Sequence, residues 1–269
     1  MDEQQILVEQ HGGVRLVTLN RPERLNGFTG RMIAALIDQF DQAAQDDGTG
    51  ALVLTGSGRA FSAGADLSSE EGLGGGRGSA SGPNRREKLD PLGAVGRLIL
   101  ALRAVEKPVI AAVNGVAAGG GFGLMSACDL RLASTAARFS TVFIRRGLAP
   151  DCGASYFLPR IVGVARATEL FLSGEMLDTE TALRDGLVSR VLPPDDLLPE
   201  ALALAARLAG GPPLATQLTL RALEGSLQNT LEEQLLLEWA GQGVCLRSED
   251  AREGIAAFLQ KRQPVWKGR

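Results

Sequence analysis

Residues 109–123 read Val-Ile-Ala-Ala-Val-Asn-Gly-Val-Ala-Ala-Gly-Gly-Gly-Phe-Gly, and this stretch decides the fold. Its first five residues predict a buried strand, and the apolar run that follows the glycines predicts a buried helix. Glycine inside an element loses roughly 0.5–1 kcal/mol relative to alanine, so this cluster indicates that the backbone itself approaches something closely. Residues 109–128 carry no charge over the length of a membrane span, but five glycines among these twenty residues argue against one.

Similar apolar runs recur on both sides of this stretch. Residues 51–55 form one that ends in Gly56-Ser57-Gly58, and residues 130–133 and 188–191 are further candidate strands. Residues 29–44 carry apolar side chains at helical spacing. Continuous apolar strands that alternate with helices are typical of a parallel sheet covered on both faces, so we predict an α/β fold.

The two ends of the chain have different patterns. His11-Gly12-Gly13 lies between two alternating runs and predicts a hairpin turn. From Thr179 onward the pattern is helical, with residues 230–246 the longest segment. Residues 68–84 are rich in Gly and Ser and predict a long loop, either functional or without fixed structure.

Composition excludes several classes of function. The chain has 269 residues, 45% of them hydrophobic, which predicts one main domain with a helical tail. A net charge of −3 without any long basic run argues against nucleic-acid binding. Three scattered cysteines and a start without a leader pattern predict a reducing, cytoplasmic location. A single histidine argues against Ser-His or Cys-His catalysis, and no metal site is predicted.

The glycine cluster fits an oxyanion-binding helix start better than a phosphate cradle. A dinucleotide fingerprint that begins at Gly119 would need glycine where Leu124 stands, which leaves a nucleotide fold as the runner-up. The unpaired N–H groups of a helix N-terminus can instead bind a developing oxyanion. A second donor could come from residues 61–66, which also follow a predicted parallel strand. We therefore predict a site at the carboxyl ends of the strands.

Together with these features, several segments resemble the crotonase (enoyl-CoA hydratase/isomerase) superfamily. The matching segments are residues 18–26, 60–67, 107–115, 119–121, 128–130 and 257–262. The resemblance implies a ββα spiral core, here residues 1–195, and a C-terminal helical region, residues 196–269, used in a homotrimer or a dimer of trimers. It also implies an acyl-CoA substrate and no separate cofactor.

The resemblance implies roles for individual residues. The backbone N–H groups of Ala65 and Gly120 would hold the thioester oxygen. The residues expected to contact CoA or the acyl group are Arg24, Leu25, Ala63, Asp66, Leu67, Phe122, Phe143, Phe258 and Lys261. Phe258 and Lys261 would reach over from the helical tail.

The reaction depends on which acids are present. The hydratases of the family use two glutamates, and those positions are Gly123 and Phe143 here. Neither side chain can carry a proton, so efficient hydration is not expected. Asp151, in the segment Gly-Leu-Ala-Pro-Asp, resembles the aspartate of the family's isomerases, where one carboxylate shuttles one proton. The alternative for Asp151 is a helix N-cap.

Three functions remain open at this point. An isomerase that uses Asp151 is favoured, with Phe122, Phe143 and Phe157 raising the pKa of its carboxyl group if they line the site. A hydratase, hydrolase or C–C bond enzyme would take its carboxylate from elsewhere, for example from Glu70. A non-catalytic acyl-CoA binding protein would keep the thioester site alone. Asp129 is expected to be structural.

Overall fold

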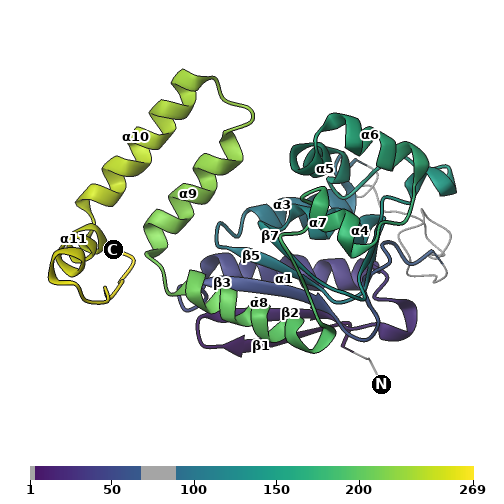
Figure 1. Ribbon diagram of the computed structural model, residues 1–269, viewed down its shortest axis with the longest axis horizontal. Helices are drawn as coiled ribbons and strands as arrows, with labels where there is room; N and C mark the ends of the chain where they lie inside the picture. The colour runs from purple at the N-terminus through teal and green to yellow at the C-terminus, as the bar shows by residue number, and fades with distance from the viewer. Residues whose placement is uncertain (1–3, 68–88) are drawn as a thin grey trace.

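The computed structural model describes residues 4–67 and 89–269. Figure 1 shows an α/β core from which a helical arm projects. A six-stranded sheet has the order β1-β2-β3-β5-β7-β9, and a smaller sheet has the order β4-β6-β8. The strands are β1 (Ile6–His11), β2 (Val14–Leu19), β3 (Ala51–Gly56), β4 (Ala60–Ser62), β5 (Val109–Val113), β6 (Val116–Ala118), β7 (Leu130–Ser134), β8 (Arg138–Ser140) and β9 (Arg190–Leu192).

Successive strands alternate between the two sheets. In the pairs β3–β4, β5–β6 and β7–β8, the first strand joins the large sheet and the second joins the small one. Helix α3 (Gly93–Arg103) lies between the first two pairs in the chain, and α4 (Gly120–Ala127) lies between the next two. All these strands pair in parallel, whereas β1 and β2 form the antiparallel hairpin predicted at His11. The predicted ββα spiral is confirmed.

Helices cover both faces of the large sheet because neighbouring strand residues point to opposite sides. Leu52 and Leu54 pack in the main core with α1 (Gly30–Gln45) and α3, whereas Val53 faces α8 (Pro194–Ala209). Leu197, Ala201 and Ala205 of α8 are buried against this second face. Helix α8 therefore belongs to the core, and the boundary expected at 195/196 falls inside it.

The helices that leave the core are α9 (Pro213–Gly225), α10 (Leu231–Arg247) and α11 (Glu249–Gln260). Figure 1 shows them as an arm with the C-terminus at its far end. Thr230 starts α10 with a capping box to Glu233, as expected for the predicted segment 230–246. Glu106 ties the arm to the core, because its carboxylate accepts hydrogen bonds from Gln217 (2.6 Å) and Arg221 (2.5 Å).

Short helices complete the core after β8. They are η2 (Phe143–Arg146), α5 (Ala154–Val162), α6 (Val164–Ser173) and α7 (Thr179–Arg184), and η1 (Pro22–Arg24) precedes α1. The uncharged stretch 109–128 forms β5, β6 and α4. Within residues 4–67 and 89–269, no helix combines the length and the apolarity that a membrane crossing requires.

Candidate active site

Two turns meet at the carboxyl ends of β4 and β6. Gly64, with φ +87°, follows β4, and Gly120 is the first residue of α4 after β6. A Cβ atom built on Gly64 would lie 2.8 Å from the Gly120 nitrogen and 2.9 Å from the Ala118 oxygen. Gly121 approaches β4 so closely that a Cβ atom would overlap the Ser62 carbonyl. The glycine cluster is therefore needed for close packing of backbone on backbone.

The N–H groups of Ala65 and Gly120 are the donors that this contact brings together. Phe28 pairs with the residues on either side of Ala65, because its N–H donates to Gly64 O (2.7 Å) and its carbonyl accepts from Asp66 N (3.0 Å). The Ala65 N–H consequently points to the opposite side. In the described part of the chain, neither Ala65 N–H nor Gly120 N–H donates a hydrogen bond. Two such donors can stabilise an oxyanion.

Two asparagines hold the turn between β3 and β4, which leads into the strand before Gly64. The buried Asn26 side chain donates to Ser57 O (2.9 Å) and Ala60 O (2.7 Å), and Asn114 donates to Gly58 O (2.9 Å). Both belong to segments that suggested the family, but their role as backbone ties was not predicted. The sequence signal that could have revealed this role is an asparagine directly after a strand or turn, where its side-chain amide can replace backbone hydrogen-bond partners.

Neither position of the family's two hydratase glutamates carries a carboxylate here. A Cβ atom built on Gly123 would lie 2.6 Å from both the Cβ and the carbonyl oxygen of Cys152. Phe143 is buried, and its ring edge lies 3.9 Å from the Cβ position of Gly119. The fold thus fills one acid position with main chain and the other with an aromatic ring.

Cys152, the residue after Asp151, lies against the first turn of α4. The Cys152 sulfur is 3.1 Å from the Cβ position of Gly120, and the Phe28 ring is 3.4 Å from that position. Helix α5 has Gly153 as its N-cap residue and no side-chain cap, so the N-cap role considered for Asp151 is wrong. Partial burial of the Asp151 carboxyl group raises its pKa above the ordinary value.

The predicted CoA-contacting residues fall into two separate groups. Ala63 N donates to Leu25 O (2.9 Å), which brings the Arg24–Leu25 turn next to the segment 63–67. Within that segment Leu67 is exposed, whereas the buried Asp66 carboxylate pairs with Arg21 (3.0 Å).

The second group lies on the arm. Phe258 is 81% exposed on α11, and Lys261 follows that helix. Figure 1 places α11 and α4 at opposite ends of the folded molecule, so a single chain does not bring Phe258 and Lys261 to the site.

The other candidate residues that the structure describes are packed against neighbouring side chains or paired with them. Phe122 is buried in α4, and Phe157 packs against Gly153 and the Tyr156 ring (centroids 5.1 Å apart). Asp129 is structural, as expected, because it accepts from Arg103 (2.7 Å) and Val109 N (2.9 Å). Glu70 and the loop 68–84 lie outside the described residues.

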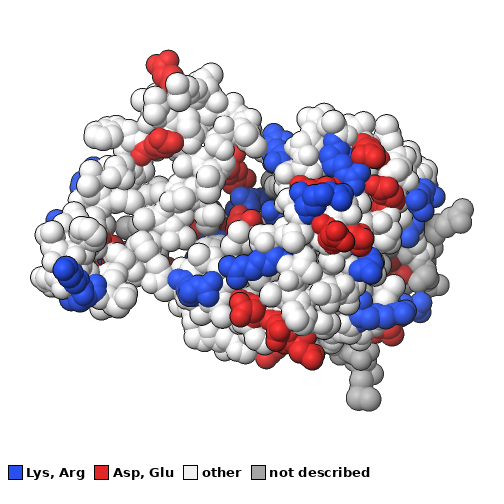
Figure 2. All heavy atoms as spheres, in the orientation of Figure 1, with Lys and Arg blue, Asp and Glu red and all other residues white. Residues whose placement is uncertain are grey.

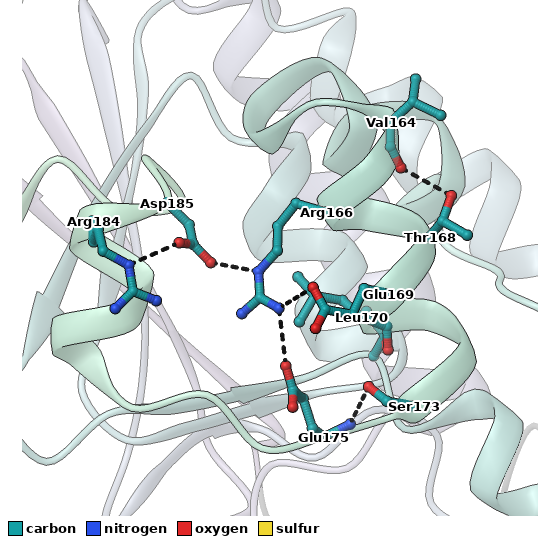
Figure 3. A network of polar contacts seen from close by, with 10 residues as sticks. Val164, Arg166, Thr168, Glu169, Leu170, Ser173, Glu175, Arg184 and Asp185 are labelled. Carbon is teal, nitrogen blue, oxygen red and sulfur yellow. Dashed lines mark hydrogen bonds and ion pairs between the residues drawn. The ribbon is translucent and has the colours of Figure 1, made fainter.

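Figure 3 shows a network centred on Arg166 of α6, which reaches Asp185 at the end of α7. Arg166 reaches Asp185 and Glu169 at 2.7 Å and Glu175 at 3.2 Å. Helix α6 also contacts the segment before η2, because Thr141 Oγ1 donates to Leu170 O (2.8 Å). Figure 2 shows charges of both signs over this part of the core, whereas the visible face of the arm is largely uncharged.

Comparison with known proteins places this geometry in context. The profile of the enoyl-CoA hydratase/isomerase family matches residues 9–269. The chain is 40% identical over 264 residues to a 1,2-epoxyphenylacetyl-CoA isomerase of Escherichia coli K12, covering 98% of each chain. It is 33% identical to a crotonyl-CoA hydratase of Syntrophomonas wolfei, again covering 98% of each chain. The structure of an enoyl-CoA hydratase from Bacillus anthracis superposes with a TM-score of 0.89 at 31% identity, covering 99% of this chain and 100% of that one.

Proposed function

The chain belongs to the enoyl-CoA hydratase/isomerase family, and from this premise we propose that it is an enoyl-CoA isomerase that shifts a double bond with one carboxylate. The thioester oxygen of the substrate accepts hydrogen bonds from Ala65 N–H and Gly120 N–H. These donors stabilise the enolate that forms when a proton leaves C2. Asp151 is the carboxylate that moves the proton.

The proposed reaction balances with a single acid–base group. The Asp151 carboxylate removes a proton from C2 of a 3-enoyl thioester, and the electron pair moves onto the thioester oxygen. The enolate then takes the same proton back at C4, which leaves a 2-enoyl thioester and a free carboxylate. CoA enters only as part of the substrate, and no other cofactor takes part.

The observation that carries this proposal is the contact between Gly123 and Cys152. A hydratase needs a base, a positioned water and a proton source, and here main chain occupies the space of the first glutamate. Asp151 directly precedes the residue that packs against Gly120 and Gly123, and burial raises the pKa of its carboxyl group, which suits a group that must accept and return a proton.

Hydration is the second candidate, and the similarity to a crotonyl-CoA hydratase favours it. In that case another carboxylate, such as Glu70, would activate the water. A purely acyl-CoA binding role is the third, and it predicts no turnover with any enoyl thioester.

A spectrophotometric assay separates these candidates. We expect purified protein to convert 3-enoyl-CoA into the conjugated 2-enoyl-CoA and to leave 2-enoyl-CoA largely unchanged. Asp151→Asn should lower kcat by at least about 100-fold and leave thioester binding intact. Rapid hydration of 2-enoyl-CoA, or an Asp151→Asn variant with normal turnover, would refute the proposal. The panel should include an aromatic acyl thioester, because one relative is named for epoxyphenylacetyl-CoA.

We also propose that the arm mediates assembly into a homotrimer or a dimer of trimers in the cytoplasm. Leu231, Trp239 and Phe258 are 73–81% exposed on α10 and α11, which is unusual for large apolar side chains of a monomer. Assembly would cover this surface, and it would let Phe258 and Lys261 approach the CoA site of another subunit.

A further inference from the structure

Ser62 is the last residue of β4, and its side chain is fully buried. The Ser62 hydroxyl donates to the Asn26 carbonyl (2.8 Å) and accepts from Gly64 N–H (3.2 Å). It thus provides partners for two backbone groups in the interior, where an unpaired polar group is costly. Ser62 therefore connects the turn after β4 to Asn26.

The N–H groups of residues 63–66 show what this hydroxyl does for the turn. Those of residues 63 and 66 donate to main-chain carbonyls at 2.9 and 3.0 Å, and that of Gly64 donates to the Ser62 hydroxyl. The fourth, Ala65 N–H, donates to none of the described residues. Without Ser62, Gly64 N–H would be a second unpaired donor, and a shift of the turn or the entry of water would relieve its cost.

Gly64 is also the residue of this turn that approaches the second donor. A Cβ atom built on Gly64 would lie 2.8 Å from Gly120 N. Ser62 itself packs on the same helix, because its Cβ atom lies 2.7 Å from the Cβ position of Gly121. The Ser62 hydroxyl therefore holds the one residue that precedes Ala65 in the chain and lies against Gly120 in space.

We propose that Ser62 is a positioning residue of the oxyanion hole. Its hydroxyl holds Gly64, and through Gly64 it sets the direction and the spacing of the Ala65 and Gly120 N–H groups. This inference rests on the proposed function, in which these two groups bind the thioester oxygen. Ser62 is 0% exposed, so it acts through the turn and not by contact with the substrate.

Ser62→Ala removes the hydroxyl and keeps the rest of the side chain. Oxyanion donors act within a narrow range of distances, so a small shift of the turn weakens them. We expect kcat for 3-enoyl-CoA to fall about 10-fold, with KM changed by less than about threefold, because these donors act mainly on the transition state.

Ser134→Ala is the matched control. Ser134 ends β7 in the large sheet, is as buried as Ser62, and its hydroxyl accepts from the N–H two residues on, that of Ala136 (3.1 Å). This variant should also lose stability in a thermal melt, but it should keep kcat. A general loss of stability would lower kcat in both variants.

Two other substitutions at the same position separate the hydroxyl from packing. Ser62→Thr keeps the hydroxyl and adds a methyl group in a filled space, so Tm should fall while kcat stays within about threefold of the unmodified protein. Ser62→Cys has a weaker hydrogen-bonding group, and its kcat should lie below that of Ser62→Thr. This order holds the test open even if Ser62→Ala does not fold.

The carbonyl stretch of a bound thioester tests the inference without turnover. The probe is a saturated acyl-CoA labelled with carbon-13 at its carbonyl, which has no double bond to move. Its infrared band should shift to lower frequency on binding to the unmodified protein, because the two N–H groups polarise the carbonyl. The shift should be smaller in Ser62→Ala and unchanged in Ser62→Thr and Ser134→Ala.

These readouts distinguish the inference from the proposed function. A protein that shifts the carbonyl band but does not convert 3-enoyl-CoA would refute the isomerase proposal, and the band in Ser62→Ala would still decide the role of Ser62. An equal shift in Ser62→Ala and the unmodified protein would overturn the inference. So would a shift in Ser62→Thr as small as that in Ser62→Ala, or no shift in the unmodified protein.

Discussion

Gly64→Ala is the substitution that most directly tests the contact between the two turns. The new Cβ atom would lie 2.8 Å from Gly120 N and 2.9 Å from Ala118 O, and both are backbone atoms that cannot swing aside. Ordinary contacts begin near 3.4 Å, so the turns would have to separate by about 0.6 Å. Oxyanion donors act within roughly 2.7–3.1 Å of the oxygen, so this shift is enough to remove one of them.

The expected magnitudes follow from this displacement. Loss of one oxyanion donor lowers kcat by roughly 100- to 1,000-fold. A left-handed residue other than glycine costs about 1–2 kcal/mol, and overpacking adds about 1–3 kcal/mol to the loss of stability. We therefore expect a folded protein with a Tm lower by several degrees and a kcat lower by about two to three orders of magnitude.

The assay is the conversion of 3-enoyl-CoA, run beside a calorimetric measurement of thioester binding and a thermal melt. Gly30→Ala is the matched control, because nothing lies within 4 Å of its Cβ position and it starts α1. That control should keep full activity. A Gly64→Ala protein with kcat within about threefold of the unmodified protein would show that the reaction does not use this pair of donors.

Three further substitutions test other parts of the structure. Burial raises the pKa of the Asp151 carboxyl group in the folded protein above its ordinary value near 3.8, so folding favours the protonated acid and stability falls as pH rises through the folded pKa. Asp151→Asn should therefore raise Tm at neutral pH and change it little below about pH 3.8. Equal shifts of Tm at both pH values would contradict this. Gly123→Ala should push the segment 151–153 away from α4 and lower both Tm and isomerase kcat, and an unchanged Tm and kcat would disprove the steric argument. Trp239→Glu, on the exposed face of α10, should reduce assembly in light scattering while the core stays folded, and an unchanged oligomer would argue against that face.

The main elements could be predicted from the sequence because their signals are local. The apolar runs at 51–55 and 109–113 became β3 and β5, and the glycines at 119–121 do bring backbone onto backbone. The domain boundary could not be placed, because the packing of α8 on the sheet depends on tertiary contacts that its amphipathic pattern does not specify.

The ambiguity of Asp151 has a similar cause. Pro-Asp before an apolar run predicts an N-cap, and α5 would then begin near residue 152. The left-handed pair Cys152–Gly153 delays the helix to Ala154 and leaves the carboxylate uncommitted to capping. No local propensity predicts a left-handed cysteine, so only the packed structure distinguishes a helix cap from a candidate acid.

The choice between isomerisation and hydration then depends on one steric relation. A glutamate at 123 and the observed position of Cys152 exclude each other, because a side chain at 123 would occupy the space of the 152 backbone. Glycine at 123 thus removes one acid, and in the same step it lets the turn that carries Asp151 settle against α4. The Cys152 backbone occupies that space, so in the proposed mechanism glycine at 123 both leaves out the first hydratase acid and lets the turn before α5 approach α4.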